Sequence, residues 1–174
     1  MQARWGRTLC ISCQVGCPLD CAFCATAKSG FVRDLTAEEI IRQIISLEQA
    51  AGRARNVVFM GMGEPFLNYD AVMEALQIIT SKDRMGFSPR HITVGTAGIV
   101  PMIRRFAEQA PRKVELAVSL NAPTDSLRRR LMPKAAKWSI AELLAACDYF
   151  TEVRGGQPVT YAYVLIAGVN DSIE

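Results

Sequence analysis

The sequence lacks any long hydrophobic run. None of its 174 residues belongs to a stretch approaching the roughly 18 to 20 apolar residues that span a bilayer, and no apolar segment follows Arg4 and Arg7. We therefore expect no membrane helix and no secretory leader, and a cytoplasmic protein. Internal repeats, low-complexity tracts and linkers are also missing, which favours a single domain over residues 1–174.

The chain also has little net charge. Its 20 Lys and Arg residues and 17 Asp and Glu residues leave a formal charge of +3, which by itself does not indicate a nucleic-acid partner. The hydrophobic share of 50% and the charged share of 21% exclude a disordered chain and provide enough apolar side chain for one core.

Cysteine, in contrast, is strongly clustered. Cys147 stands apart, whereas the other cysteines all lie within residues 10–24. Because thiols stay reduced in a chain without a secretory leader, a dense group favours a metal or redox site over a disulfide framework. Cys147 falls on the apolar side of a helix that Ser139 and Glu142 open as a capping box, so we expect it to be a small core residue.

Short apolar runs alternate with amphipathic helical patterns along the rest of the chain, as in repeated βα units on a parallel sheet. Five units are too few to close an eight-fold barrel. We therefore expect an α/β fold, a partial open (β/α) barrel of about five to six parallel strands with outer helices. The expected strands are 7–14, 56–60, 91–96, 113–120 and 158–166, and the expected helices follow Thr36 and Ser139 and cover 69–80 and 99–110.

In parallel α/β folds, functional groups gather in the loops that follow the carboxyl ends of the strands. One of these loops carries the cysteines, and the next carries a glycine-rich turn with Gly63 and Glu64. The glycine lets the backbone approach a ligand, and the carboxylate can accept a hydrogen bond from an ammonium group. The expected loops are 15–34, 61–68, 95–98, 119–137 and 167–171.

Cys17, Cys21 and Cys24 form a Cys-x3-Cys-x2-Cys pattern with Phe23 before the last thiol. Three thiolates can hold three irons of a [4Fe–4S] cluster, which leaves the fourth iron without a protein ligand. An open coordination position marks a reactive metal site rather than a structural one. The open iron can bind the amino and carboxylate groups of S-adenosylmethionine.

A zinc-binding module is the alternative for the same residues. Cys10 with Cys13 and Cys21 with Cys24 could form its two pairs, but the gap between them is short for a zinc ribbon and Cys17 is left over. A local Cys10–Cys13 disulfide is also poor, because three residues of strand span about 10 Å and bridged Cα atoms lie within about 7 Å.

The cysteine pattern resembles that of the radical S-adenosylmethionine superfamily, and its context is similar to the RlmN/Cfr family of RNA adenine methyltransferases, more closely to its RlmN-like members. The resemblance covers essentially the whole chain. It is carried by Thr8-Leu9-Cys10-Ile11-Ser12-Cys13-Gln14-Val15-Gly16-Cys17, Cys21-Ala22-Phe23-Cys24-Ala25-Thr26-Ala27, Met60-Gly61-Met62-Gly63-Glu64-Pro65, Ser119-Leu120-Asn121-Ala122-Pro123 and Gly168-Val169-Asn170-Asp171.

The resemblance implies a set of S-adenosylmethionine contacts. Phe23 matches a residue near the adenine moiety, and Gly95 stands where the family commonly has Ser, so we expect only a backbone contact there. The cofactor-binding set implied by the resemblance is Phe23, Gly63, Glu64, Gly95, Ser119, Leu120 and Asn121, beside the metal ligands Cys17, Cys21 and Cys24.

The resemblance also implies a reaction in which a methyl group reaches C2 of an adenine in 23S ribosomal RNA and transfer RNA. Two molecules of S-adenosylmethionine are used, and a cysteine near the enzyme's C-terminus carries the methyl group. Cys10 matches the resolving thiol, which forms a disulfide with that cysteine. No methyl-carrying counterpart lies within residues 1–174, and Cys147 is a poor substitute. We therefore expect an incomplete radical core, about half an enzyme, that binds cluster and cofactor but does not turn over alone.

The implied partners are ribosomal and transfer RNA and an electron donor such as flavodoxin, with a monomeric enzyme and no membrane. Positive loop residues near the pocket would hold phosphates around an extruded base. The alternatives are a Cfr-like C8 methyltransferase and a glycyl-radical activase. The candidate phosphate contacts are Lys28, Arg33, Arg128, Arg129, Arg130, Lys134 and Lys137, although a solvated helix face explains any one of them equally well.

Overall fold

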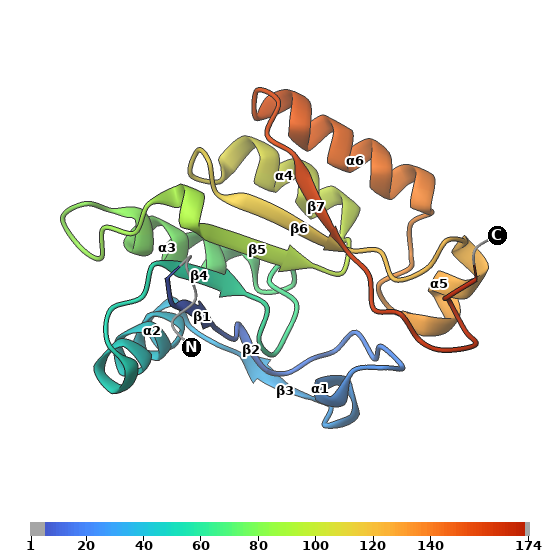
Figure 1. The fold of residues 1–174 in the computed structure, drawn as a ribbon, viewed down its shortest axis with the longest axis horizontal. Helices are drawn as coiled ribbons and strands as arrows, with labels where there is room; N and C mark the ends of the chain where they lie inside the picture. The colour runs from blue at the N-terminus through green and yellow to red at the C-terminus, as the bar shows by residue number, and fades with distance from the viewer. Residues whose placement is uncertain (1–5, 173–174) are drawn as a thin grey trace.

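The computed structural model describes residues 6–172, whose strands alternate with helices along the chain. Figure 1 shows their arrangement. The strands are β1 (Thr8–Cys10), β2 (Gln14–Gly16), β3 (Phe31–Asp34), β4 (Asn56–Phe59), β5 (Ile92–Thr96), β6 (Glu115–Ser119) and β7 (Val159–Ala162). The helices are α1 (Ala25–Lys28), α2 (Ala37–Ala51), α3 (Tyr69–Thr80), α4 (Val100–Gln109), α5 (Asp125–Leu131) and α6 (Ile140–Val153), with a short 3-10 helix, η1 (Pro89–His91).

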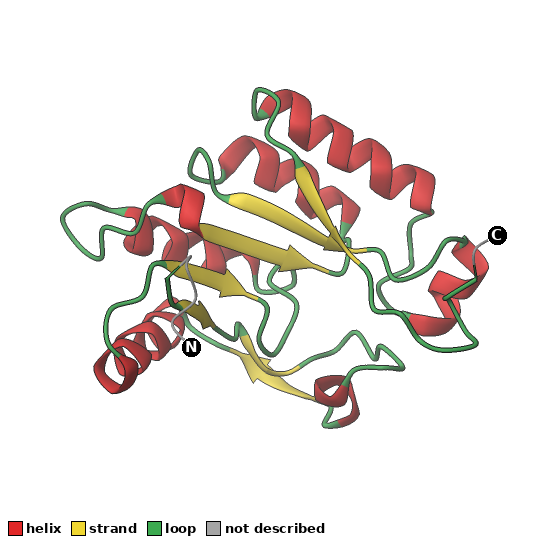
Figure 2. Cartoon of the chain, viewed as in Figure 1, coloured by secondary structure: helices red, strands yellow, loops and turns green. Residues whose placement is uncertain are grey.

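The main sheet has five strands in the order β1-β4-β5-β6-β7, and every neighbouring pair is parallel. This confirms the predicted open α/β architecture and the position of each predicted strand, although the strands are shorter than expected at both ends of the sheet. The long helices α2, α3, α4 and α6 cover one face of the sheet (Figure 2). The carboxyl ends of β4, β5 and β6 point toward α1 and α5 (Figure 1).

The helices begin where the sequence places polar caps. The Thr36 hydroxyl accepts a hydrogen bond from the Glu39 backbone N–H, and the Glu39 carboxylate accepts one from the Thr36 backbone N–H, which completes a capping box. Ser139 and Glu142 form the second box at the start of α6. Beyond these caps, Ile40 and Ile44 of α2 are fully buried in the core, which also takes in Cys147 as predicted.

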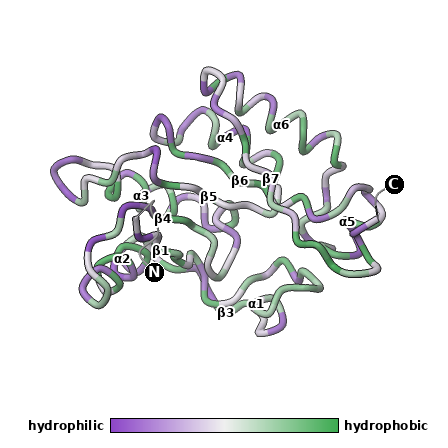
Figure 3. The backbone as a smooth tube through the Cα atoms, in the orientation of Figure 1, coloured by the Kyte–Doolittle hydropathy of each residue, from purple (hydrophilic) through white to green (hydrophobic). Residues whose placement is uncertain are grey.

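Two further features lie outside the main sheet. A small antiparallel sheet of β2 and β3, which the sequence analysis did not anticipate, brackets the cysteine segment. Hydrophilic residues gather in outlying connections, such as the loop 81–88 after α3 (Figure 3). No helix within residues 6–172 is long and apolar enough to cross a membrane.

Candidate metal and cofactor centre

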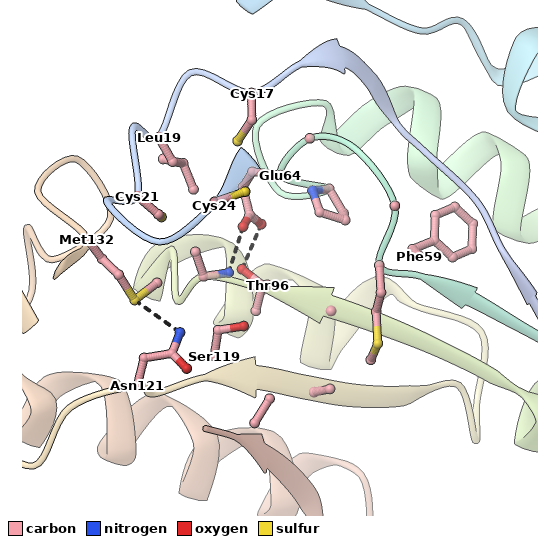
Figure 4. A pocket seen from close by; sticks show the side chains of 18 of the residues that line it. Cys17, Leu19, Cys21, Cys24, Phe59, Glu64, Thr96, Ser119, Asn121 and Met132 are labelled. Carbon is pink, nitrogen blue, oxygen red and sulfur yellow. Dashed lines mark hydrogen bonds between the residues drawn. The ribbon is translucent and has the colours of Figure 1, made fainter. Parts of the chain in front are cut away.

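A cavity of about 250 Å³ lies at the carboxyl ends of the strands. The cysteine loop forms one side, and the ends of β4, β5 and β6 face it across the hollow (Figure 4). Its wall is mostly apolar, with a few polar groups among the apolar ones, the composition typical of small-molecule sites. The lining residues include Cys17, Cys21, Phe23, Cys24, Phe59, Met60, Gly63, Glu64, Gly95, Thr96, Ser119, Asn121 and Met132.

The cysteine loop is closed at its base by the β2–β3 pair. Gly16, the last residue of β2, pairs with Phe31, and the next backbone N–H, that of Cys17, donates to the Gly30 carbonyl oxygen at 3.0 Å. Gly16 has a φ of 80°, and a Cβ at this position would collide with the Gly30 carbonyl oxygen. Only glycine therefore allows the two strands to meet directly before Cys17.

The far side of the cysteine loop rests on α5. The backbone N–H of Ala22 donates to the carbonyl oxygen of Leu131, the last residue of α5, at 2.9 Å. Lys134, which follows α5, lies 3.7 Å from the Asp20 carboxylate. The loop that carries the three cysteines is thus held at its base by β3 and at its tip by α5.

All six cysteines are free thiols. Burial raises the pKa of Cys17, and burial followed by the neighbouring Cys17 and Cys24 raises the pKa of Cys21 to about 12. Without a metal these thiols therefore hold their protons at neutral pH. Because iron binds the thiolate form, loading this site must release protons.

The donor set fits a [4Fe–4S] cluster better than a single zinc ion. Tetrahedral zinc with Zn–S bonds of about 2.3 Å brings its sulfur atoms to within about 3.8 Å of each other. Within residues 6–172 no three His, Cys, Asp or Glu side chains are grouped closely enough for a single ion. Cys17, Cys21 and Cys24 instead line one cavity from the same loop, and three separate thiols can each bind one iron of a cluster.

Glu64 lies 2% exposed in the turn after β4, and its carboxylate joins that turn to the next one. It accepts hydrogen bonds from the Thr96 hydroxyl at 2.7 Å, the Ala97 backbone N–H at 2.6 Å and the Phe66 backbone N–H at 3.0 Å. Burial raises the pKa of Glu64, although the three donors favour the ionised form. A carboxylate can accept about four hydrogen bonds, so one acceptor position is left for a ligand.

Asn121 lies in the turn two residues after β6 and has the left-handed conformation, with a φ of 58°. Its side-chain oxygen accepts the Val164 backbone N–H at 2.9 Å, and its amide nitrogen donates to the Met132 sulfur at 3.5 Å. Asn170, also buried, donates to the Asn121 carbonyl oxygen at 2.8 Å. The turns after β6 and β7 are therefore fixed to each other at the rim of the cavity.

A family model described as "Radical SAM superfamily" matches residues 11–174. The chain belongs to this superfamily. It is 46% identical to the "Probable dual-specificity RNA methyltransferase RlmN" of Symbiobacterium thermophilum, with 100% of the chain and 47% of that protein aligned. It is 48% identical to the "Dual-specificity RNA methyltransferase RlmN" of Anaeromyxobacter sp., over 97% of the chain and 46% of that protein.

A solved structure gives the same result for the radical SAM fold. The crystal structure of a radical SAM methyltransferase from Sphaerobacter thermophilus superposes with a TM-score of 0.89 at 48% identity, over 95% of this chain and 49% of that one. The chain spans about half the length of the curated relatives it matches.

The cavity beside the cysteine loop contains most of the residues that the sequence singled out. The exceptions are Cys10 and Leu120, which do not line it. Cys10 lies exposed at the edge strand β1, beside a separate hollow formed with α2. Leu120 packs against the core, and its carbonyl oxygen accepts a hydrogen bond from Arg128. The predicted residues that line the cavity beside the cysteine loop are Cys17, Cys21, Phe23, Cys24, Gly63, Glu64, Gly95, Ser119 and Asn121.

The expected group of phosphate-binding arginines needs correction. Residues 128–130 lie on α5 rather than in a loop, and Arg128 is only 1% exposed, so it cannot reach an RNA backbone. Arg129 and Arg130 on the same helix are exposed. Arg33 is exposed but already forms two 2.8 Å hydrogen bonds with Glu39.

Sequence reasoning missed three polar groups that hold Glu64 at the cavity. Thr96 and the Ala97 backbone bind Glu64, and the buried Gln14 accepts the Glu64 backbone N–H at 2.9 Å while donating to Asp34 at 2.7 Å. Each is recognisable only through its three-dimensional partner. Cys13, whose role the sequence left open, is 2% exposed and donates its thiol to the Met62 carbonyl oxygen.

Proposed function

We propose that residues 1–174 form the radical SAM core of an RNA methyltransferase of the RlmN type. The proposed reaction transfers a methyl group to C2 of adenine in 23S ribosomal RNA and transfer RNA, through a methyl-cysteine intermediate. The proposed cofactors are a [4Fe–4S] cluster and S-adenosylmethionine. Relatives named dual-specificity RNA methyltransferases, 46% and 48% identical, support this assignment.

One observation carries the proposal. Cys17, Cys21 and Cys24, which are close in the sequence, line the same cavity as the buried Glu64, at the carboxyl ends of the parallel strands. Cys17, Cys21 and Cys24 would hold the cluster, and its fourth corner would bind the cofactor. When bound, the cluster and S-adenosylmethionine supply one-electron cleavage of a carbon–sulfur bond.

The residues around the cavity have distinct proposed roles. The remaining acceptor position of Glu64 would bind the ammonium group of the cofactor, and the Gly63 turn would let the backbone approach it. Phe59, Met60 and Phe23 would exclude water from the reacting atoms. Ser119, the Leu120 backbone and Asn121 would bind the nucleoside part from the end of β6.

Cys10 is the proposed resolving thiol. It lies at the open edge of the sheet, exposed and apart from the cluster cavity, where a thioether partner from outside residues 1–174 can reach it. Its attack on the thioether sulfur would form the sulfur–sulfur bond and break the carbon–sulfur bond. The electron pair of the broken bond would go to the base-bound carbon, which takes up the proton lost by the Cys10 thiol, so the methylated base is released. The Cys10 partner is proposed to be a cysteine of the longer protein.

Exposed basic side chains beside the cavity supply the proposed RNA contact. Arg129 and Arg130 project from α5, which supports the cysteine loop, and Lys134 follows it. Such groups attract phosphates and hold RNA around an extruded base. The enzyme is proposed to receive electrons from a flavodoxin-like donor and to act as a monomer.

Anaerobic reconstitution tests the core assignment. Loading residues 1–174 with iron and sulfide should give about four irons per chain and an electron paramagnetic resonance signal that S-adenosylmethionine perturbs. Cys24→Ala should lose the signal, and Cys147→Ala, which alters a buried cysteine that does not line the cavity, should keep it. A chain that binds zinc and no iron would contradict the assignment.

A chimera tests the substrate. Residues 1–174 would replace the matching segment of the Symbiobacterium thermophilum relative, and methyl label would be measured in ribosomal and transfer RNA. Mass spectrometry of the nucleosides should detect 2-methyladenosine, and Cys10→Ser should block its release. Appearance of 8-methyladenosine instead would identify a Cfr-like enzyme.

A further inference from the structure

Arg128 is the largest fully buried side chain among residues 6–172. It lies on α5 directly before the exposed Arg129 and Arg130, and only 1% of its surface is exposed. No carboxylate among residues 6–172 forms an ion pair with it. A guanidinium in this position costs free energy unless something compensates its charge.

The hydrogen bonds of Arg128 satisfy only part of the guanidinium. Nη2 donates to the Ala97 carbonyl oxygen at 2.6 Å, and Nε donates to the Leu120 carbonyl oxygen at 3.3 Å. Nη1 is buried without a hydrogen-bond partner among the described residues. A buried donor without an acceptor is rare and indicates that a partner is missing.

The surroundings of Arg128 indicate which partner this is. Cys21 and Asp125 are the acidic groups near enough to raise its pKa, against the lowering effect of burial. Asp125 already accepts the Ile140 backbone N–H at 2.7 Å. The helix that bears Arg128 also holds the cysteine loop, through the bond from Ala22 to Leu131. Among these acidic groups, the thiol of Cys21 belongs to the site that becomes strongly anionic when iron binds.

We propose that Arg128 is the buried countercharge of the iron–sulfur site, and that it stabilises the added electron when the cluster is reduced. This inference rests on the proposed cluster. Arg128 is a positioning and electrostatic residue, not a ligand. Its positive charge makes addition of one electron from an external donor more favourable, so it raises the midpoint potential of the cluster, which depends on nearby charge and hydrogen bonds.

Ala97 links this countercharge to the cofactor pocket. Its backbone N–H donates to Glu64, and its carbonyl oxygen accepts from Arg128. The turn after β5 is thereby held between a buried carboxylate and a buried guanidinium. Gly98, the next residue, has a φ of 99°, and a Cβ there would lie 3.0 Å from Arg128 Nη2, so the turn leaves space for the arginine head.

The experiment compares three variants after anaerobic reconstitution. Arg128→Gln keeps a donor for one carbonyl oxygen but removes the charge, Arg128→Lys keeps the charge, and Arg129→Gln removes an exposed charge from the same helix. Iron content, circular dichroism of the iron-free chain and the midpoint potential from a mediator titration followed by electron paramagnetic resonance are the readouts. None depends on methyl transfer.

The proposal expects a lower midpoint potential in Arg128→Gln, a potential close to wild type in Arg128→Lys and no shift in Arg129→Gln. An unchanged potential in Arg128→Gln, or equal shifts in the Lys and Gln variants, would overturn it. Failure of either iron-free Arg128 variant to fold would also overturn it, because the role would then be to join the Ala97 and Leu120 turns. A wild-type chain that takes up no iron would refute the proposed cluster itself, a result distinct from these.

Discussion

The carboxylate of Glu64 accepts a 2.6 Å hydrogen bond from the backbone N–H of Ala97. The two residues belong to successive turns, after β4 and after β5, that lie side by side because the strands are parallel neighbours. This hydrogen bond joins the two turns at the wall of the cavity. The sequence suggests Glu64 only as a ligand-binding group. In the structure its carboxylate also holds the neighbouring turn in place.

Glu64→Gln should destabilise the iron-free chain by about 1 to 3 kcal/mol. Thr96, Ala97 and Phe66 all donate to the carboxylate, so an amide must turn its NH2 group toward a donor. Urea denaturation measures the loss, and binding of S-adenosylmethionine to the loaded chain should weaken as well. The control is Glu74→Gln on the exposed side of α3, which should change stability by less than about 0.5 kcal/mol.

Gly16→Ala should open the cysteine loop, while Gly30→Ala should not. Both glycines have positive φ, so both substitutions should cost about 1 to 2 kcal/mol of backbone strain. The methyl group of an alanine at position 16 would collide with the Gly30 carbonyl oxygen, whereas the methyl group of an alanine at position 30 would meet open space. Iron content after reconstitution should fall in the Gly16 variant and stay near wild type in the Gly30 variant. Equal iron content in the two variants would contradict the closing role of β2 and β3.

Gly95→Ser should fold and bind S-adenosylmethionine more tightly. Gly95 lines the cavity, and an added Cβ would lie 3.0 Å from Cγ of the flexible Met60 side chain and 3.2 Å from the Phe59 carbonyl oxygen, so the fit requires a shift of a few tenths of an ångström. A hydroxyl at this position adds a donor to a mostly apolar wall, so affinity should rise roughly 2-fold to 10-fold, as for one hydrogen bond of about 0.5 to 1.5 kcal/mol. Equilibrium dialysis with labelled cofactor measures the change. Unchanged affinity in a folded variant would show that the hydroxyl makes no contact.

The Arg33–Glu39 pair should make the stability of the chain depend on acid pH. Hydrogen bonds from Arg33 and from the Thr36 backbone lower the pKa of Glu39 to about 2, below the value of about 4.3 expected in the unfolded chain. A lowered folded pKa adds stability above the unfolded pKa, and this stability disappears as pH falls through the folded value. The wild type should therefore have a higher free energy of unfolding than Glu39→Gln above pH of about 5. This difference in stability should shrink as the pH falls toward about 2.

Chemical denaturation at a series of pH values tests this dependence. Glu38→Gln, on the same turn of α2, removes an exposed carboxylate that pairs only with Arg42 and serves as the control for loss of charge. A difference between wild type and Glu39→Gln that does not vary between pH of about 2 and 7 would contradict the role of the pair.

The sequence by itself determined the local features. Apolar runs fixed the strands β4, β5 and β6, and the capping boxes at Thr36 and Ser139 fixed two helix starts. The spacing of Cys17, Cys21 and Cys24 predicts the proposed cluster ligands. These features depend on neighbours a few residues apart in the chain, where periodicity and capping are decisive. The parallel order of the strands then followed, because βα units can be joined in few ways.

Only the tertiary structure decided which partners meet across the chain. Arg128 belongs to a run of three arginines, yet it alone is buried, because α5 turns that side toward the Ala97 and Leu120 carbonyl oxygens. Cys10 and Cys17 lie close in sequence, yet Cys10 lies at an open sheet edge and Cys17 lines the cavity. Such differences come from long-range packing and the satisfaction of buried polar groups, which no local pattern of residues encodes.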